Sequence, residues 1–150
     1  MTLALVTLVF GLALEALITE EHIYYRPHEM FSHPDSRYQK NVHFEMTMPH
    51  GDLKALALYT EVEPEPRKVI FHTDSLGFRN SGEYQGQKYL FVGDSFIVGN
   101  GTTQADIITE QLAKGYGFDA YNLSFPGGIK EYYSNVQSFK KISAQDAKVI

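Results

Sequence analysis

The 150-residue sequence predicts an α/β domain with a parallel sheet that helices cover on both faces. Its second half alternates the two element types: strands at Tyr89 to Val92, Ala120 to Ser124 and Ala147 to Ile150, and helices around Gln104 to Lys114 and Lys130 to Lys141. Strands that alternate with helices of this length join into a parallel sheet through right-handed crossovers. Hydrophobic residues make up 43% of the chain, which is enough to bury a single-domain core.

The first element is a hydrophobic helix over residues 1–19. Met1 to Ile18 is apolar apart from two threonines, Gly11 and Glu15, and as a helix it would span roughly 27 Å, barely a bilayer core. No lysine or arginine precedes the run, and Ala13 to Ala16 offers a poor cleavage site. The segment is therefore a membrane anchor with Glu15 at its interfacial end, a secretion signal, or a helix buried by one face.

A β-rich subdomain is expected over residues 20–66. Val42 to Met48 alternates apolar and polar residues with the period of a strand, and Leu53 to Val62 can return beside it as an antiparallel hairpin after a turn at Pro49 to Asp52. Glu63-Pro64-Glu65-Pro66 ends the segment, because paired prolines forbid helix and weaken strand pairing. The remaining residues, 67–150, form the third expected unit.

The six histidines are candidate metal ligands. They show neither helical i,i+4 pairing nor a short strand-spaced pair with a nearby carboxylate, and the chain has no cysteine. We therefore expect no metal site, unless the fold brings imidazoles close enough to share one ion.

After a short strand at Lys68 to Phe71, the sequence predicts a tight turn. Asp74 to Gly77 has the Asp-x-x-Gly form of a type I turn, after which Phe78 can enter the core. Arg79 could hold a substrate carboxylate or phosphate through its planar guanidinium, but a pairing with Asp74 would use the same donors. We expect the internal pairing.

Cap signals set the bounds of the helix around Gln104 to Lys114. Thr103 with Asp106 three residues later resembles a capping box, and Gly115 stands where a left-handed terminator is expected.

Ligand sites in parallel sheets covered by helices lie beyond the carboxyl ends of the strands. The loops Gly93-Asp94-Ser95 and Ser124 to Gly128 are therefore expected to face one crevice.

Composition and motif spacing exclude other classes of ligand. The net charge of -5 gives no electrostatic reason to expect nucleic acid as a partner. Gly93 to Gly99 lacks the Gly-Lys-Ser/Thr end of a phosphate-binding loop, and Gly99-Asn100-Gly101 lacks the third dinucleotide glycine. Gly-Asp-Ser alone is also a good generic turn.

Two spaced blocks carry a family resemblance. Gly93-Asp94-Ser95 after an apolar strand, followed by Asn122 to Gly127 at the end of the next, resembles the first two blocks of the SGNH hydrolase superfamily, the GDSL-like esterases. Thr73 to Asn80 resembles a segment of bacterial SGNH-like proteins with an N-terminal membrane anchor and a small β-rich region. The likeness covers roughly residues 70–139.

The resemblance implies a three-layer, flavodoxin-like parallel sheet and a hydrolase or acyltransferase. Its members act on esters, commonly acyl groups of lipids or cell-surface glycans, without a metal or organic cofactor. Together with a membrane anchor, it places the globular part outside the cytoplasm, in the periplasm or at the cell surface.

Carried over by residue, the resemblance makes Ser95 the nucleophile. The N–H groups of Ser95 and Gly127 become the oxyanion donors, each worth about 2.7 to 4 kcal/mol of barrier. Glycine suits the second oxyanion-donor position, because it lacks a Cβ and lets the backbone approach the intermediate closely. Asp94 is expected to stabilise the turn rather than act as a base.

Two blocks of the family pattern are missing from the sequence. Neither Gly-x-Asn-Asp, which supplies a third oxyanion donor, nor Asp-x-x-His, which supplies the base and its orienting carboxylate, occurs in the chain. The expectation is an N-terminal fragment that alone is inactive, with His72 as a remote substitute base. The alternative is a non-catalytic remnant or scaffold of the same fold.

Overall fold

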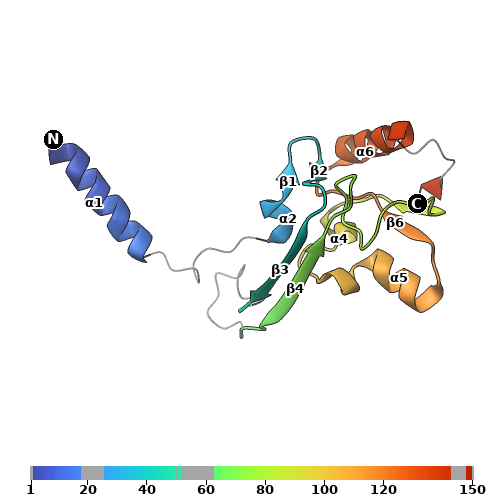
Figure 1. The fold of residues 1–150 in the computed structure, drawn as a ribbon, viewed down its shortest axis with the longest axis horizontal. Coiled ribbons are helices and arrows are strands. Elements are labelled where there is room, and N and C mark those ends of the chain that lie inside the picture. The colour runs from blue at the N-terminus through green and yellow to red at the C-terminus, as the bar shows by residue number, and fades with distance from the viewer. Residues whose placement is uncertain (1, 18–25, 50, 52–62, 143–147, 150) are drawn as a thin grey trace.

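Figure 1 shows a computed structural model that describes residues 2–17, 26–49, 51, 63–142 and 148–149. The elements are α1 (Thr2–Leu17), α2 (Pro27–Met30), β1 (Ser32–His33), β2 (Arg37–Tyr38), β3 (His43–Met48), β4 (Arg67–His72), β5 (Tyr89–Phe91), α4 (Ser95–Val98), a 3₁₀ turn (Gln104–Asp106), α5 (Ile108–Tyr116), β6 (Ala120–Asn122), α6 (Ile129–Ile142) and β7 (Lys148–Val149). The fold is mixed α/β, as the sequence predicts.

The apolar N-terminal helix is confirmed as α1. Its 16 residues are mostly leucine, alanine and valine, and they include no proline, so the segment can form a helix. The last turn contains no basic residue. The side chains of residues 3–17 are exposed, so no face of α1 is buried against other described residues. Within the described residues, no helix has both the length and the apolar character needed to cross a membrane.

β3 and β4 form an antiparallel sheet. The alternation predicted for β3 is confirmed: Phe44, Met46 and Met48 turn inward, while the residues between them are exposed. The partner of β3 in this sheet is β4, with Phe44 opposite Phe71. The boundary expected at residue 66 thus runs between two strands of one sheet, and the return strand expected over 53–62 falls outside the described residues.

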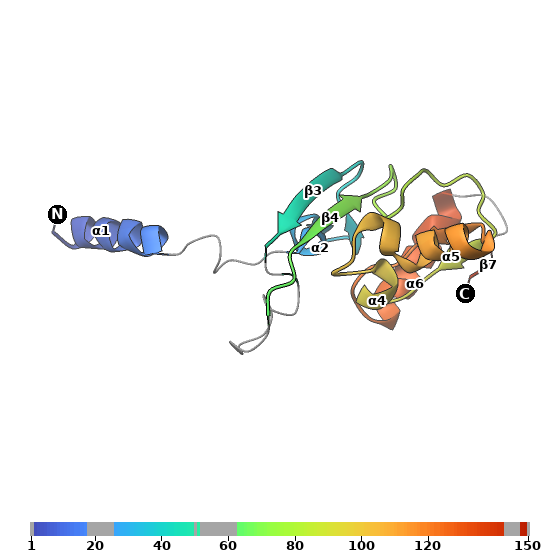
Figure 2. The same cartoon turned by 90° about the horizontal axis from the view of Figure 1, so that it is seen from below.

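β5 is the central strand of a three-stranded parallel sheet with the order β6-β5-β7. Leu90 lies opposite Tyr121 of β6 on one side and opposite Val149 of β7 on the other. Figures 1 and 2 place α5 and α6 on opposite sides of this sheet. The strands and α6 fall where the sequence predicts them.

One buried cluster lies between the parallel sheet and α6. Its fully buried members are Phe78, Leu90, Tyr121, Leu123 and Phe139. The rings of Tyr84 and Phe139 meet edge to face with centroids 4.7 Å apart, an arrangement that aromatic pairs favour. The expected entry of Phe78 into the core is confirmed.

The start of the predicted helix at Gln104 is wrong. Residues 104–106 form a 3₁₀ turn, and α5 begins only at Ile108. The hydroxyl of Thr103 makes no capping bond, because it accepts the N–H of Ile70 in β4 at 2.9 Å. A contact 33 residues away in sequence therefore removes the predicted cap.

The end of α5 also differs from the prediction. Gly115 is helical, whereas Gly117 adopts φ of 67° and donates its N–H to Ala113 and Leu112. Phe118, the next residue, packs its ring against Tyr89 at 5.2 Å between centroids. Both Gly115 and Gly117 fit the local pattern of a helix terminator. The packing of Phe118 on β5 is satisfied when the helix ends at Gly117.

Candidate active site

Asp94 starts the short helix α4 directly after β5. Its backbone is extended, and its carboxylate accepts the N–H of Phe96 at 3.0 Å, as an N-cap residue does. The predicted turn-stabilising role of Asp94 is confirmed. The helix itself was missed, because four residues are too short to give a periodic signal.

Glycines bracket α4. A Cβ at Gly93 would lie 2.5 Å from Cγ1 of Ile97, so the approach of this helix to the preceding loop requires a glycine. Gly99 ends the helix in the left-handed region, at φ of 79°, and its N–H donates to Ser95 and Phe96. This geometry places Ser95 at the first helical residue, just beyond the end of β5.

The loop after β6 is hydrogen-bonded to the loop after β5. Phe125 donates its N–H to the carbonyl of Gly93 at 3.3 Å, and Leu123 donates to Phe91 at 2.8 Å. The buried Asn122 reaches α4 itself, because its Nδ2 donates to the carbonyl of Ile97 at 3.2 Å. The two loops that the sequence pairs in one crevice therefore adjoin.

Gly127 lies exposed in the second loop, ahead of α6. Its carbonyl accepts the hydroxyl of Tyr132 at 2.7 Å, while the next N–H, of Gly128, donates to Glu131 at 2.8 Å. A Cβ at Gly127 would meet the Glu131 side chain at 2.9 Å. Both ends of the 127–128 peptide are thus fixed by the first turn of α6.

Two carboxylates, of Asp94 and Glu131, act on the side chains at the start of α6. The Gly128 N–H lowers the pKa of Glu131, since it stabilises the ionised carboxylate. Partial removal from water raises the pKa of Tyr132, and the carboxylates of Asp94 and Glu131 add to this shift.

Ser95 is half-buried, and its hydroxyl has no hydrogen-bond partner among the described residues. The backbone N–H groups of Ser95 and Gly127 likewise donate to no described residue. No described residue therefore competes for the predicted nucleophile or for the two predicted oxyanion donors. No described histidine is hydrogen-bonded to Ser95, so the part of the chain that the structure describes gives it no base.

His72 is engaged elsewhere. Its ring lies against that of His43 with centroids 4.8 Å apart, across the β3–β4 pair. Burial lowers the pKa of His72, and the neighbouring His43 and Arg79 lower it further. Among the described residues, no group of three or more histidines and carboxylates could hold a metal ion.

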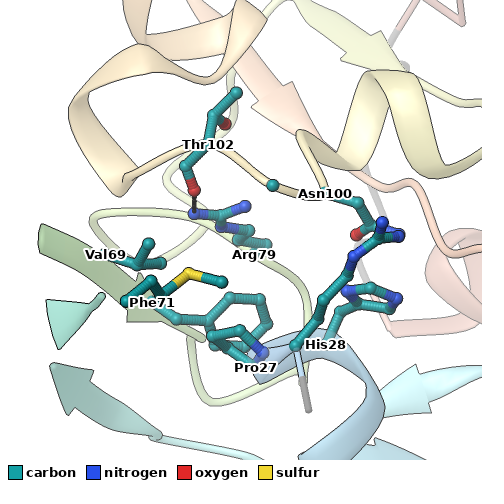
Figure 3. Close-up of a pocket in the computed structure, with 10 residues that line it drawn as sticks. Pro27, His28, Val69, Phe71, Arg79, Asn100 and Thr102 are labelled. Carbon is teal, nitrogen blue, oxygen red and sulfur yellow. Dashed lines mark hydrogen bonds between the residues drawn. The ribbon is translucent and has the colours of Figure 1, made fainter. Parts of the chain in front are cut away.

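Arg79 is an internal residue, as expected, but its expected partner is wrong. The guanidinium is 1% exposed and donates to the carbonyls of residues 70, 98, 99 and 102 and to the amide oxygen of Gln104. It also lies 4.7 Å above the Phe71 ring. Figure 3 shows it in the wall of a small cavity, turned toward Thr102.

All five N–H donors of Arg79 are thus satisfied by uncharged oxygens, and none remains for an anionic ligand. Burial lowers the pKa of Arg79 to about 10. The alternative in which Arg79 holds a substrate carboxylate or phosphate is not supported by this geometry.

Asp74 forms a buried polar network that the sequence did not reveal. Its Oδ1 accepts the N–H groups of Leu76 and Phe78, and its Oδ2 accepts Asn80 Nδ2 at 3.0 Å and the Tyr121 hydroxyl at 2.5 Å. Tyr121 is 47 residues away in sequence, so only the fold brings the pair together. The turn predicted at Asp74 to Gly77 is confirmed by the 3.1 Å bond from the Gly77 N–H to the Asp74 carbonyl.

Comparisons with protein-family models, with curated proteins and with solved structures gave no match to this chain.

Proposed function

We propose that this chain carries the nucleophile half of an SGNH-type serine esterase or acyltransferase. The observation that carries the proposal is the hydrogen bond from Phe125 N–H to the Gly93 carbonyl, which holds the Ser95 loop beside the Gly127 loop. A half-buried serine hydroxyl and two backbone N–H groups, none of them bonded to a described residue, then belong to adjoining loops. The three-layer, flavodoxin-like architecture of such enzymes is part of the same proposal.

In the proposed reaction, Ser95 Oγ attacks an ester carbonyl and its proton passes to a base. The N–H groups of Ser95 and Gly127 stabilise the oxyanion, the alcohol leaves with the proton, and an acyl-serine remains. Water or a second alcohol then takes the acyl group. The described residues do not supply this base, because no described histidine is hydrogen-bonded to Ser95.

Exposed apolar side chains support an acylated lipid or glycan of the cell envelope as the substrate. Phe96, the neighbour of Ser95, is 81% exposed, and Ile129, which follows Gly128, is 83% exposed. Exposed apolar residues beside a site favour contact with an acyl chain. The exposed apolar residues of α1 support attachment to a membrane. The extracytoplasmic side is the one that the resemblance to envelope esterases implies.

A serine-directed fluorophosphonate tests the proposal. We expect one adduct per folded chain, mapped to Ser95 by peptide mass spectrometry and absent from Ser95→Ala. Labelling should be slow, since a missing general base typically costs about 10²- to 10⁴-fold in rate. Ser134→Ala, which removes an exposed hydroxyl on α6, is the matched control and should label like the parent chain.

Failure to label the folded chain, or equal labelling of Ser95→Ala, would contradict the proposal. The first result favours the second candidate, a non-catalytic scaffold of the same fold. Circular dichroism of each variant shows whether folding is retained. A free serine hydroxyl alone is compatible with both candidates, so the experiment decides between them.

A further inference from the structure

We propose that His43 and His72 form a binding site for one divalent transition-metal ion, such as Zn²⁺, on the β3–β4 sheet. The two residues are 29 positions apart in sequence and lie directly opposite each other in the antiparallel register. Side chains of directly opposed residues stand on the same face of a sheet with their Cβ atoms about 5 Å apart. The fold thus supplies the histidine pair that no sequence spacing predicts.

The two imidazole rings are in edge-to-face contact across the strand pair. The two imidazole centroids are 4.8 Å apart, with an angle of 69° between the ring planes. Two imidazoles that share a tetrahedral zinc ion, with Zn–N bonds of about 2.0–2.1 Å, have centroids roughly 5 Å apart. The ring separation is therefore the one that a shared ion needs, and binding requires the two side chains to turn one nitrogen each toward the ion.

The ring nitrogens of both residues are available. Neither His43 nor His72 makes a side-chain hydrogen bond to any described residue. His33 provides the contrast, because its Nδ1 is already held by Asp35 at 2.8 Å. Unbonded imidazole nitrogens on a partly exposed strand pair can bind a cation without breaking other contacts.

The surroundings determine which ions fit. Imidazole nitrogens favour Zn²⁺, Cu²⁺ and Ni²⁺ over Mg²⁺ and Ca²⁺, which prefer oxygen ligands. Glu45, two residues from His43 on the same face, is paired with Lys68 at 2.6 Å. Among the described residues no third histidine or carboxylate is grouped with the pair, so water completes the coordination. The nearby Arg79 charge limits the affinity.

Isothermal titration calorimetry with ZnCl₂ in a non-chelating buffer tests the site. We expect one ion per chain, and His43→Ala and His72→Ala each to weaken binding by at least about tenfold, since each removes one of two protein ligands. His33→Ala is the control and should leave the affinity unchanged. MgCl₂ should give no heat of binding.

A zinc titration of the unsubstituted chain, followed by nuclear magnetic resonance, does not depend on whether the alanine variants fold. Zn²⁺ should shift the imidazole signals of His43 and His72 together and leave those of His33 in place. Unchanged affinity in both alanine variants, or a zinc-induced shift confined to other histidines, would overturn the proposal. Neither outcome depends on whether Ser95 is a nucleophile.

Discussion

Arg79 is buried with only neutral acceptors around its guanidinium. The residue joins β4 to the end of α4, since it binds the carbonyl of Ile70 on one side and those of Val98 and Gly99 on the other. A cation at a helix end also stabilises the carbonyls that lack helical partners. Its role is to hold the Ser95 helix against the antiparallel sheet, which makes it a structural residue.

Replacing Arg79 by lysine should lower the free energy of unfolding by at least about 2 kcal/mol. Lysine offers three donors in place of five, and each buried acceptor left without a partner costs about 1–3 kcal/mol. Urea denaturation measures the change. Arg37→Lys is the control: Arg37 pairs with Asp35 at a partly exposed position, so we expect a change of less than about 1 kcal/mol. Equal effects at both positions would contradict the assigned role.

The contribution of Asp74 to the free energy of unfolding should depend on pH. Burial raises its pKa in the folded state above the ordinary value of 3.8, even though four donors favour the ionised form. A carboxyl with a raised folded pKa binds its proton more tightly when folded. Its contribution to stability is therefore fully present below about pH 3.8 and is lost as the pH rises through the raised pKa.

The comparison of the parent chain with Asp74→Asn isolates this contribution, because asparagine does not titrate. We expect the unfolding free energy of the parent minus that of the variant to be largest at acid pH and to fall as the pH rises toward neutrality. Guanidinium denaturation at a series of pH values measures the difference. A difference that grows with pH would show that the hydrogen bonds from Tyr121 and Asn80 outweigh burial.

At the scale of elements, α5 shows where local patterns fail. The capping residue Thr103 is used by β4, and of two glycines in the last turn only Gly117 is left-handed. By contrast, α6 and the parallel strands match the prediction closely. The helix α6 is long enough to show a helical apolar period, and the strands alternate with helices at the spacing of a parallel sheet. The start and end of α5 depend on tertiary contacts, so the sequence could not supply them.

The two glycines of α5 give a matched pair of substitutions. Gly115→Ala should stabilise the protein by about 0.5–1 kcal/mol, because position 115 is helical and a Cβ there meets nothing within 4 Å. Gly117→Ala should destabilise it by about 1 kcal/mol, because alanine is strained at φ of 67°. Thermal unfolding measures both changes in stability. If Gly115→Ala destabilised the protein and Gly117→Ala stabilised it, the helix would end at Gly115.

Across the whole molecule, one cluster joins the β3–β4 sheet to the parallel sheet through Tyr38 of β2. Tyr38 packs its ring against Phe71 of the antiparallel sheet and against Phe125 of the loop after β6, with centroids 5.3 and 5.0 Å apart. Burial raises the pKa of the Tyr38 hydroxyl. The β-rich region is thereby packed against the candidate site, and the expected division at residue 66 does not separate two independent cores.

The candidate site was partly predictable from the sequence. Gly93-Asp94-Ser95 and Gly127 follow neighbouring parallel strands, so strand order alone brings their loops together. The Asp74–Tyr121 bond, the contacts of Arg79 and the His43–His72 pair depend on approaches between segments distant in sequence. No local pattern in a single sequence contains that information.

The most direct test of the central claim is the amide spectrum of the chain before and after phosphonylation of Ser95. If Ser95 and Gly127 form one oxyanion site, both amide protons should shift strongly downfield in the adduct, as charge-assisted hydrogen bonds form. The Gly128 amide, already bonded to Glu131, should move little. An adduct at Ser95 that leaves the Gly127 amide unchanged would contradict the account.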